Sequence, residues 1–317
     1  MKNLIASILL GACLHVSAQR TEPVSTWNFG DNVASSIKEV DANVVNGSIT
    51  LSGSNATIAT VEMFISGNSP DIRSRQWTDG EIEQELERSF AIDVKIEGEK
   101  LLVVATTKAS RPLFSASFKI TVPKHVNGNL LTKNGSLNVE HVSANISGRT
   151  TNGSISAKNS NGNIILTTTN GSVNISNLEG VISAITTNGL VTAHTVSGEL
   201  KAETTNGSIK LQEISGNVDA RIEPARGRDT RNSGNNITVT MVFVSDYVKL
   251  SSRGNANLTL PASRGYTLNV KADGITTSGL KNFRGNTERN KSMEGTVGEG
   301  GALIEVSTSQ KTSLTFE

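Results

Sequence analysis

The chain has 317 residues, of which 36% are hydrophobic and 4% aromatic, and its formal net charge is +1. That charge balance argues against electrostatic capture of nucleic acid or of an anionic membrane surface. The few aromatic residues and 29 glycines are unlike a globular enzyme core and typical of a thin β structure with many turns. Regularly placed Ile, Val and Leu argue against a disordered chain.

Residues 1–18 have the composition of a secretory signal peptide. Lys2 supplies the positive end, an apolar segment follows, and small residues allow cleavage after Ala18. Cys13, the only cysteine, would leave with this peptide. An alternative stays open, in which Leu10–Cys13 is a lipoprotein box, but the apolar run continues past the cysteine and favours cleavage. The sequence therefore predicts export to the periplasm, the outer-membrane surface or the medium, and no later apolar run is long enough to span a bilayer.

Residues 19–125 are predicted to form an N-terminal β region with one short helix. Residues 45–51 (VVNGSIT) look like an early copy of a strand and corner found later in the chain. Thr78 to Glu81 has the spacing of a capping box. Apolar residues then recur every fourth position, at Ile82, Leu86 and Phe90. This pattern predicts a helix at about 79–90 that caps or flanks the repeat.

Residues 126–221 form a regular repeat. Glycine occupies every ninth position from Gly153 to Gly216, and the letters TTNG return every eighteenth position. Apolar residues fall two and four places after each glycine, which is the period of a strand with one buried face. Alternate halves differ at the seventh place, where one half has Leu178, Val196 and Ile214 and the other has Thr169, Thr187 and Thr205. The repeating unit is therefore eighteen residues, built from two unequal halves.

Two architectures satisfy this period. An antiparallel meander would use Asn-Gly turns as hairpins, whereas a parallel β-solenoid would stack eighteen-residue coils of two short strands and two corners. Only stacking explains why residue identity returns at eighteen, and the crossover rule makes such a coil right-handed. We predict an all-β parallel solenoid, a right-handed β-helix. Its structural ladder would comprise Asn152, Asn170, Asn188 and Asn206, with Gly153, Gly171, Gly189 and Gly207 beside them.

Residues 222–317 are predicted to continue the β structure and cap it. A polar loop at 221–236 interrupts the repeat first. Its arginines are candidates for contact with an anionic glycan, although a solvated loop is the simpler interpretation. These candidate partner-binding residues are Arg221, Arg226, Arg228 and Arg231.

No motif in the chain predicts catalysis, a metal or a cofactor. The nine-residue period invites comparison with calcium-binding β-rolls, but Asp219 is the only aspartate between Val126 and Ala220. His141 and His194 do not share a stacked position, and no cysteine joins them. Because the Thr pairs are adjacent in sequence, they point to opposite sides or form corners, which argues against an ice-binding array.

The TTNG units, a strand at 118–123 ending in Val-Pro and a later strand ending in Leu-Pro resemble a bacterial family. That family consists of β-strand repeat proteins of unknown function, often labelled "putative adhesin". The resemblance covers about residues 40–317 and is strongest at 118–220. It implies an exported, non-enzymatic β-solenoid on the cell envelope. The family has no established catalytic residues, so none is transferred to this chain.

The leading hypothesis is an exported structural or interaction protein, an adhesin that binds a surface glycan, an envelope protein or another copy of itself. One alternative is a polysaccharide lyase or hydrolase on a β-helix scaffold, which would need paired carboxylates in a groove. Another is an envelope-stress scaffold or sensor. The sequence indicates neither the ligand nor the oligomeric state.

Overall fold

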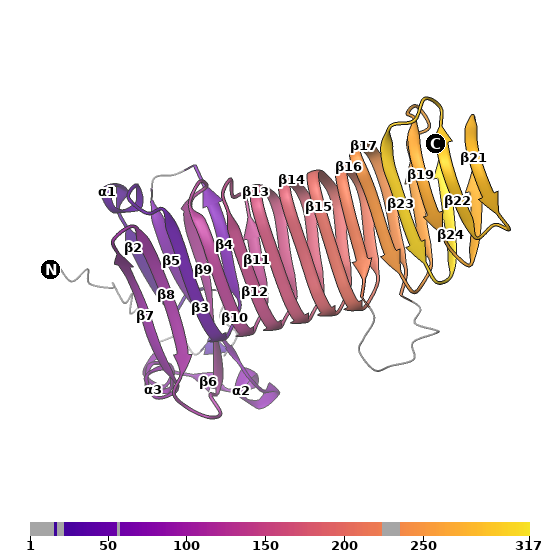
Figure 1. Cartoon of the computed structure of the whole chain (residues 1–317). Helices are drawn as coiled ribbons and strands as arrows, with labels where there is room; N and C mark the ends of the chain where they lie inside the picture. The colour runs from indigo at the N-terminus through magenta and orange to yellow at the C-terminus, as the bar shows by residue number, and fades with distance from the viewer. Residues whose placement is uncertain (1–15, 18–21, 56–57, 224–234) are drawn as a thin grey trace. The chain divides into compact units, whose positions relative to one another are not determined.

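The computed structural model describes residues 16–17, 22–55, 58–223 and 235–317. The predicted signal peptide at 1–18, with Cys13, lies outside this range apart from the two-residue strand β1 (Val16–Ser17). Within the described chain, no helix combines the length and apolarity needed to cross a membrane. The chain divides into two compact units, Met1–Ser156 and Ala157–Glu317 (Figure 1). The predicted segment bounds 19–125, 126–221 and 222–317 stay predictions.

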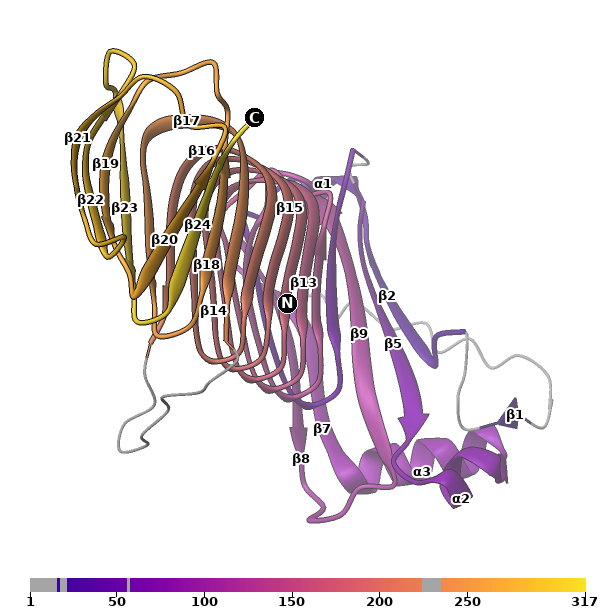
Figure 2. The same cartoon turned by 90° about the vertical axis from the view of Figure 1, so that its right-hand side faces the viewer.

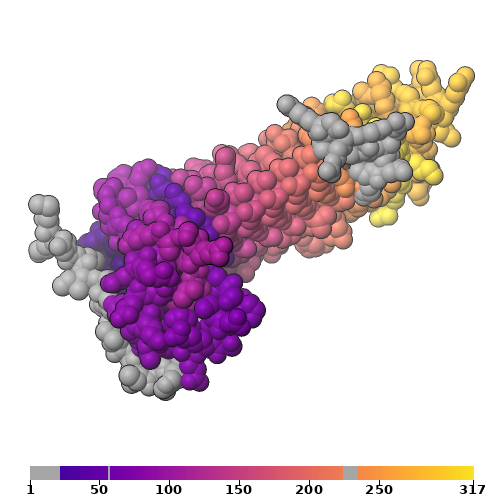
Figure 3. All heavy atoms as spheres, turned by 90° about the horizontal axis from the view of Figure 1, so that it is seen from below, coloured from indigo at the N-terminus to yellow at the C-terminus, as the bar shows by residue number. Residues whose placement is uncertain are grey.

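The second unit is a stack of parallel coils. Successive coils pair in register, so that Val173 lies opposite Val191, which lies opposite Ile209. This pairing confirms the predicted parallel solenoid and rules out an antiparallel meander in these coils. Figure 2 shows the coils nested behind one another, and Figure 3 shows them as regular rows. The long strands are β13 (Ile155–Asn170), which crosses the unit boundary, β14 (Val173–Asn188), β15 (Val191–Asn206), β16 (Ile209–Ile222) and β17 (Ile237–Ser252).

Each of these coils is one long bent strand rather than the two short strands that we predicted. From β14 to β16 the ladder continues past the bend because these coils bend at the same register position, whereas the register between β16 and β17 shifts there. In β14, β15 and β16 one bend residue has a left-handed backbone, with φ of 53° at Asn177, 54° at Thr195 and 56° at Glu213, whereas β17 has no such residue. Three positions later, a glycine also has positive φ: Gly180, Gly198 and Gly216.

The narrow core of the coils is apolar, with a single column of threonine. The first Thr of each TTNG unit is buried and the second is not, so adjacent Thr side chains do point to opposite sides. Thr186 Oγ1 donates to the Gly171 carbonyl at 2.7 Å, and Thr204 Oγ1 donates to the Gly189 carbonyl at 3.0 Å. The two halves of a coil therefore bury different positions. The half that ends in TTNG buries the sixth residue after its glycine, as at Thr186, whereas the other half buries the seventh, as at Leu178.

Thr186→Val should lower the free energy of unfolding by about 1 kcal/mol, because the shape is retained but the Gly171 carbonyl loses its side-chain donor. Urea denaturation followed by circular dichroism measures the change. Thr187→Val is the matched control, since this neighbouring side chain is exposed and should change stability by less than about 0.5 kcal/mol. Equal effects of the two substitutions would contradict the inward donor role.

The first coil of the first unit lies between two later segments of chain. One side pairs with residues 100–123 and the other with residues 127–140, all in parallel. The chain thus adds a coil on each side of its first one. The coil consists of β3 (Glu39–Asn46) and β4 (Ile49–Ser54); its neighbours are β8 (Lys100–Thr107) with β9 (Phe114–Pro123), and β10 (Asn127–Asn134) with β11 (Leu137–Glu140), followed by β12 (Ile146–Asn152).

Antiparallel strands and helices complete the first unit. β5 (Ala59–Gly67) pairs with β9, β2 (Ser25–Phe29) pairs with β5, and β7 (Phe90–Glu97) pairs with β8. The predicted helix at 79–90 is confirmed as α3 (Asp79–Ser89), and both hydrogen bonds of its capping box are present. Three short elements were not predicted: α1 (Asp31–Ala34), α2 (Pro70–Ser74) and β6 (Gln76–Trp77).

The end of the second unit is also assembled out of chain order. β23 (Ala302–Thr308) lies between β17 and β19 (Tyr266–Lys271), while β24 (Lys311–Phe316) lies between β18 (Ala256–Leu260) and β20 (Gly274–Ser278). The last strands, β19, β22 (Ser292–Val297) and β21 (Phe283–Glu288), pair antiparallel.

Candidate binding surfaces

The asparagines of the repeat are used within the fold. In the second unit, Asn206 Nδ2 donates to Asn188 Oδ1 at 2.7 Å and Asn188 Nδ2 donates to Asn170 Oδ1 at 2.8 Å. In the first unit, Asn152 donates to Asn134 at 2.8 Å. Each amide donates to one coil and accepts from the next, which orients the exposed corner side chains. The glycines beside these asparagines have no room for a side chain. An added Cβ would lie close to the carbonyl oxygen of the glycine one coil earlier, at 2.0 Å for Gly153, 2.0 Å for Gly189 and 1.8 Å for Gly207.

Arg221 is the only one of the four candidate arginines that lies in the described chain. Its guanidinium donates through Nε and Nη2 to the two carboxylate oxygens of Asp219, at 2.8 Å each. This hydrogen-bonded carboxylate raises the pKa of Arg221, and Glu203 and Glu223 add to the effect. The charge of Arg221 is thus already compensated, which weakens the case for an anion contact. Arg226, Arg228 and Arg231 lie outside the described residues.

The second half of each coil carries charges that alternate from strand to strand. In register order the row is Lys201, Asp219, Lys249 and Glu305. Beside it, the Tyr247 hydroxyl donates to Glu199 at 3.4 Å. Because each charge faces opposite charges one strand spacing away, this face is close to neutral in sum.

The first half of the coils presents a row of amide and hydroxyl side chains, interrupted by one lysine, Lys210. One outward residue per strand lies in this row, and all are exposed or half-buried. Thr192 Oγ1 donates to Asn174 Oδ1 at 2.6 Å, so neighbours in the row contact one another. We name this row the amide–hydroxyl face; it comprises Asn174, Thr192, Lys210, Thr238, Asn257, Ser313 and Thr276.

A His, a Thr and a Glu meet at one corner of the second unit. Thr195 Oγ1 lies 2.8 Å from His194 Nδ1 and donates to Glu213 Oε2 at 2.8 Å. A hydroxyl has one proton, so the imidazole must donate to Thr195 rather than accept from it. The imidazole is therefore not the base for Thr195, whose proton goes to the carboxylate of Glu213. The left-handed backbone of Thr195 is shared by the equivalent corner residues Asn177 and Glu213. The cluster is consistent with a corner contact.

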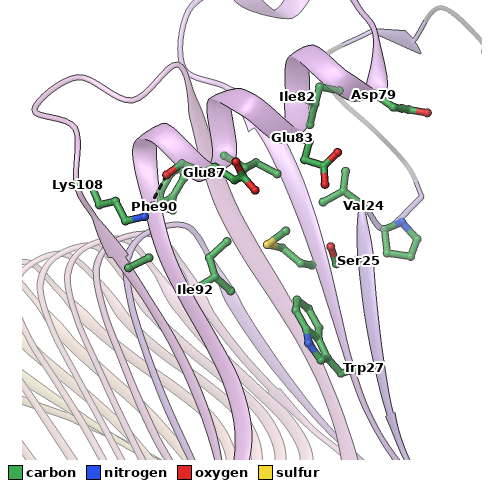
Figure 4. A pocket seen from close by; sticks show the side chains of 14 residues that line it. Val24, Ser25, Trp27, Asp79, Ile82, Glu83, Glu87, Phe90, Ile92 and Lys108 are labelled. Atoms are coloured by element: carbon green, nitrogen blue, oxygen red, sulfur yellow. Dashed lines mark hydrogen bonds between the residues drawn. The ribbon is translucent and has the colours of Figure 1, made fainter. Parts of the chain in front are cut away.

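A cleft of about 830 Å³ lies under α3 in the first unit (Figure 4). Its floor comes from β2, β5 and β7, which contribute Trp27, Met63 and Ile92. Trp27 and Ile92 are half-buried, whereas Met63 is buried. The volume falls in the range of ligand sites, which are concave and mostly apolar with a few polar groups. Sequence analysis missed this cleft.

Packing behind the cleft fixes the position of α3. Ile82 of the helix packs with Trp77 and Phe114 in one buried cluster. The two rings meet edge to face with centroids 4.9 Å apart, and Trp77 Nε1 donates to the Ile72 carbonyl at 3.1 Å. Near the C-terminus of the helix, Lys108 Nζ donates to the Glu87 carbonyl at 3.1 Å. The helix is therefore held on both sides.

Among the described residues, no three His, Cys, Asp or Glu side chains come together as a metal-binding group. The acidic residues of α3 are partly engaged in other ways, since Glu81 pairs with Arg75 at 2.7 Å and Glu85 pairs with Arg88 at 2.7 Å.

No protein-family profile and no curated protein matches the sequence. A solved "putative cell adhesion protein" from Clostridium sporogenes aligns at TM-score 0.23 with 12% identity, covering 92% of this chain and 98% of that one. "Putative adhesins" from Bacteroides fragilis and Parabacteroides distasonis align at TM-scores of 0.36 and 0.31 with 12% and 13% identity. Each covers 92% of this chain, and the alignments span 96% and 95% of those chains. These superpositions are too loose to support an argument.

Proposed function

We propose that this chain is an exported, non-enzymatic interaction protein that binds a cell-surface glycan along its amide–hydroxyl face. This face is the observation that supports the proposal. It repeats donors and acceptors at the strand spacing of about 4.8 Å over consecutive coils. A partner that is itself extended, repetitive and rich in hydroxyl groups would meet the same contact again at each coil. An envelope protein with an extended segment is the other partner that the face suits.

The chemistry of the face favours a neutral glycan over an anionic one. Lys210 is its only ionisable member, and Arg221 is neutralised by Asp219 on the other half of the coil. Each contact along such a face is weak, so affinity comes from many equivalent contacts made together. Binding should therefore depend on the length of the glycan and only slightly on salt.

Export and attachment follow from the signal-peptide pattern at residues 1–18 and belong to the same proposal. With cleavage after Ala18, the mature protein would reach the periplasm, the outer-membrane surface or the medium. Lipidation at Cys13 would instead tether it to a membrane. Mass determination of the N-terminal peptide from the exported protein distinguishes the two outcomes.

Co-sedimentation with insoluble neutral polysaccharides tests the binding proposal. Thr192→Val together with Thr238→Val removes two hydroxyl groups but keeps the shape and the strand propensity. At about 1 kcal/mol for each hydrogen bond, the double variant should bind roughly tenfold to thirtyfold more weakly. Lys201→Gln with Lys249→Gln is the matched control on the charged half, and it should bind like the natural protein.

Two results would count against this function. Equal binding by the Thr double variant and the natural protein would remove the amide–hydroxyl face from the interaction. Release of soluble sugar from the polysaccharide during the same assay would instead indicate the lyase or hydrolase alternative.

A further inference from the structure

The stack of the first unit ends in two open strand edges. β2 is the last strand of the column β4, β9, β5 and β2, and β7 is the last strand of the column β3, β8 and β7. Among the described residues, neither pairs with a strand along its other edge. An unpaired strand edge offers backbone N–H and C=O groups to an added strand.

The two edges differ in chemistry. β7 carries Asp93, Lys95 and Glu97 on its exposed side, and Lys95 pairs with both acids at 2.8 and 2.9 Å. Charges of this kind are a common protection against strand addition. β2 (Ser25–Phe29) has no ionisable side chain. β2 is therefore the less protected of the two edges.

The cleft beside β2 offers apolar contacts to such a strand. Trp27 and Val24 of the β2 region and Ile92 of β7 line it, and each is only half-buried (Figure 4). One strand further into the stack, the paired inward positions are fully covered: Ala105 opposite Ile92, and Val61 opposite Trp27. Apolar side chains entering the cleft would supply the cover that the next coil supplies elsewhere.

The rim of the cleft is acidic. Glu83 and Glu87 lie one helical turn apart on the side of α3 that lines the cleft, and both are exposed (Figure 4). The one basic residue in the lining, Lys108, is bound to the Glu87 carbonyl. An entering strand would meet a negative field at the rim, which selects for positive charge.

We propose that the cleft under α3 binds an extended peptide segment with alternating apolar and basic residues, which adds to the free edge of β2. The strand edge explains why the ligand has a peptide backbone, since a cationic amphiphile would leave those backbone groups unused. The apolar floor takes one set of side chains, and Glu83 and Glu87 pair with the other. This site is independent of the glycan-binding face.

Fluorescence anisotropy of a labelled eight-residue peptide of alternating lysine and valine tests the proposal with the full chain. This peptide should bind, while a peptide with glutamate in place of lysine should not. A lysine–valine peptide with N-methylated backbone amides should also fail, because it cannot form the ladder. Glu83→Gln with Glu87→Gln should weaken binding roughly threefold to tenfold, as expected for two exposed ion pairs.

Two further variants complete the test. Glu288→Gln with Glu294→Gln makes the same change of charge in the second unit and should leave the affinity unchanged. Ile92→Thr keeps a β-branched residue and should weaken binding roughly tenfold by reducing the apolar floor. Equal binding of the N-methylated and unmodified peptides would overturn the proposal. So would self-association of the chain that Glu83→Gln with Glu87→Gln abolishes, because the occupant would then be a second copy.

Discussion

Gly216→Ala is expected to lower the free energy of unfolding of the second unit by at least about 3 kcal/mol. The Cβ would lie 1.9 Å from the Gly198 carbonyl oxygen of the preceding coil, far inside contact distance. The φ of Gly216 is +134°, a backbone conformation that an L side chain rarely adopts. The steric clash cannot be relieved without moving β16 away from β15, which breaks the hydrogen bonds between these two coils. Urea unfolding and soluble yield measure the effect.

Gly274→Ala is the matched control in the same unit. A Cβ there would lie 3.6 Å from Lys311 Cγ, an ordinary contact with a flexible side chain. Its effect should be within about 0.5 kcal/mol of zero, and reduced freedom of the unfolded chain favours a small gain. An unchanged unfolding midpoint for Gly216→Ala would mean that the coils are farther apart than the structure places them.

The stacked coils could be predicted because the residues that specify each coil lie within eighteen positions of one another in the sequence. Asn-Gly corners and inward apolar residues recur at a fixed offset, and each coil needs only its neighbour to bury its face. The corner at Asn177 and its equivalents was less visible, because Asn, Thr and Glu occupy it in successive coils. Only the glycine three positions later is constant there. The prediction of two separate strands failed at this corner.

The order of the coils in the first unit could not be predicted. Asn46 pairs in register with Asn134, 88 positions later, rather than with a coil eighteen residues away. Periodicity shows that VVNGSIT is a coil but says nothing about which later strand covers it. The same holds for β23 and β24, which enter between strands that precede them in the chain. Such long-range pairings depend on the whole fold.

The cleft was missed for a related reason. α3 itself was predicted from its capping box and apolar spacing, but the floor brings together Trp27, Met63 and Ile92 from three separate strands. One signal was available in the sequence. Five of the eleven helix residues are acidic, which is unusual for a surface that only packs against a core. This charge indicates a helix with an exposed acidic side, but it does not indicate that a cleft lies beneath the helix.

Glu85→Ala is expected to lower the free energy of unfolding of the first unit by about 2–3 kcal/mol, because it removes a buried hydrogen-bonded carboxylate. The side chain of Glu85 is only 8% exposed. Its Oε1 accepts from Ser89 Oγ at 2.5 Å and from the Leu113 backbone N–H at 3.3 Å. Ser89 is fully buried, so it would lose its partner without access to water. Glu83→Ala, which removes an exposed carboxylate at the rim of the cleft on the same helix, is the control and should change the free energy of unfolding little.

The carboxylate of Glu85 also makes this stability depend on pH. Burial alone would raise its pKa, but hydrogen bonds from Ser89, Arg88 and the Leu113 N–H, with the charge of Arg88, hold the pKa below its usual value. A lowered folded pKa stabilises the fold above the unfolded value of about 4.3, and this contribution is lost as pH falls through the folded pKa. Comparison with Glu85→Gln isolates it: the stability difference should be constant near neutral pH and shrink below about pH 4. A difference that stays constant into acid would show that α3 is held by the shape of this contact and not by its charge, which would leave the roof of the cleft in place at low pH.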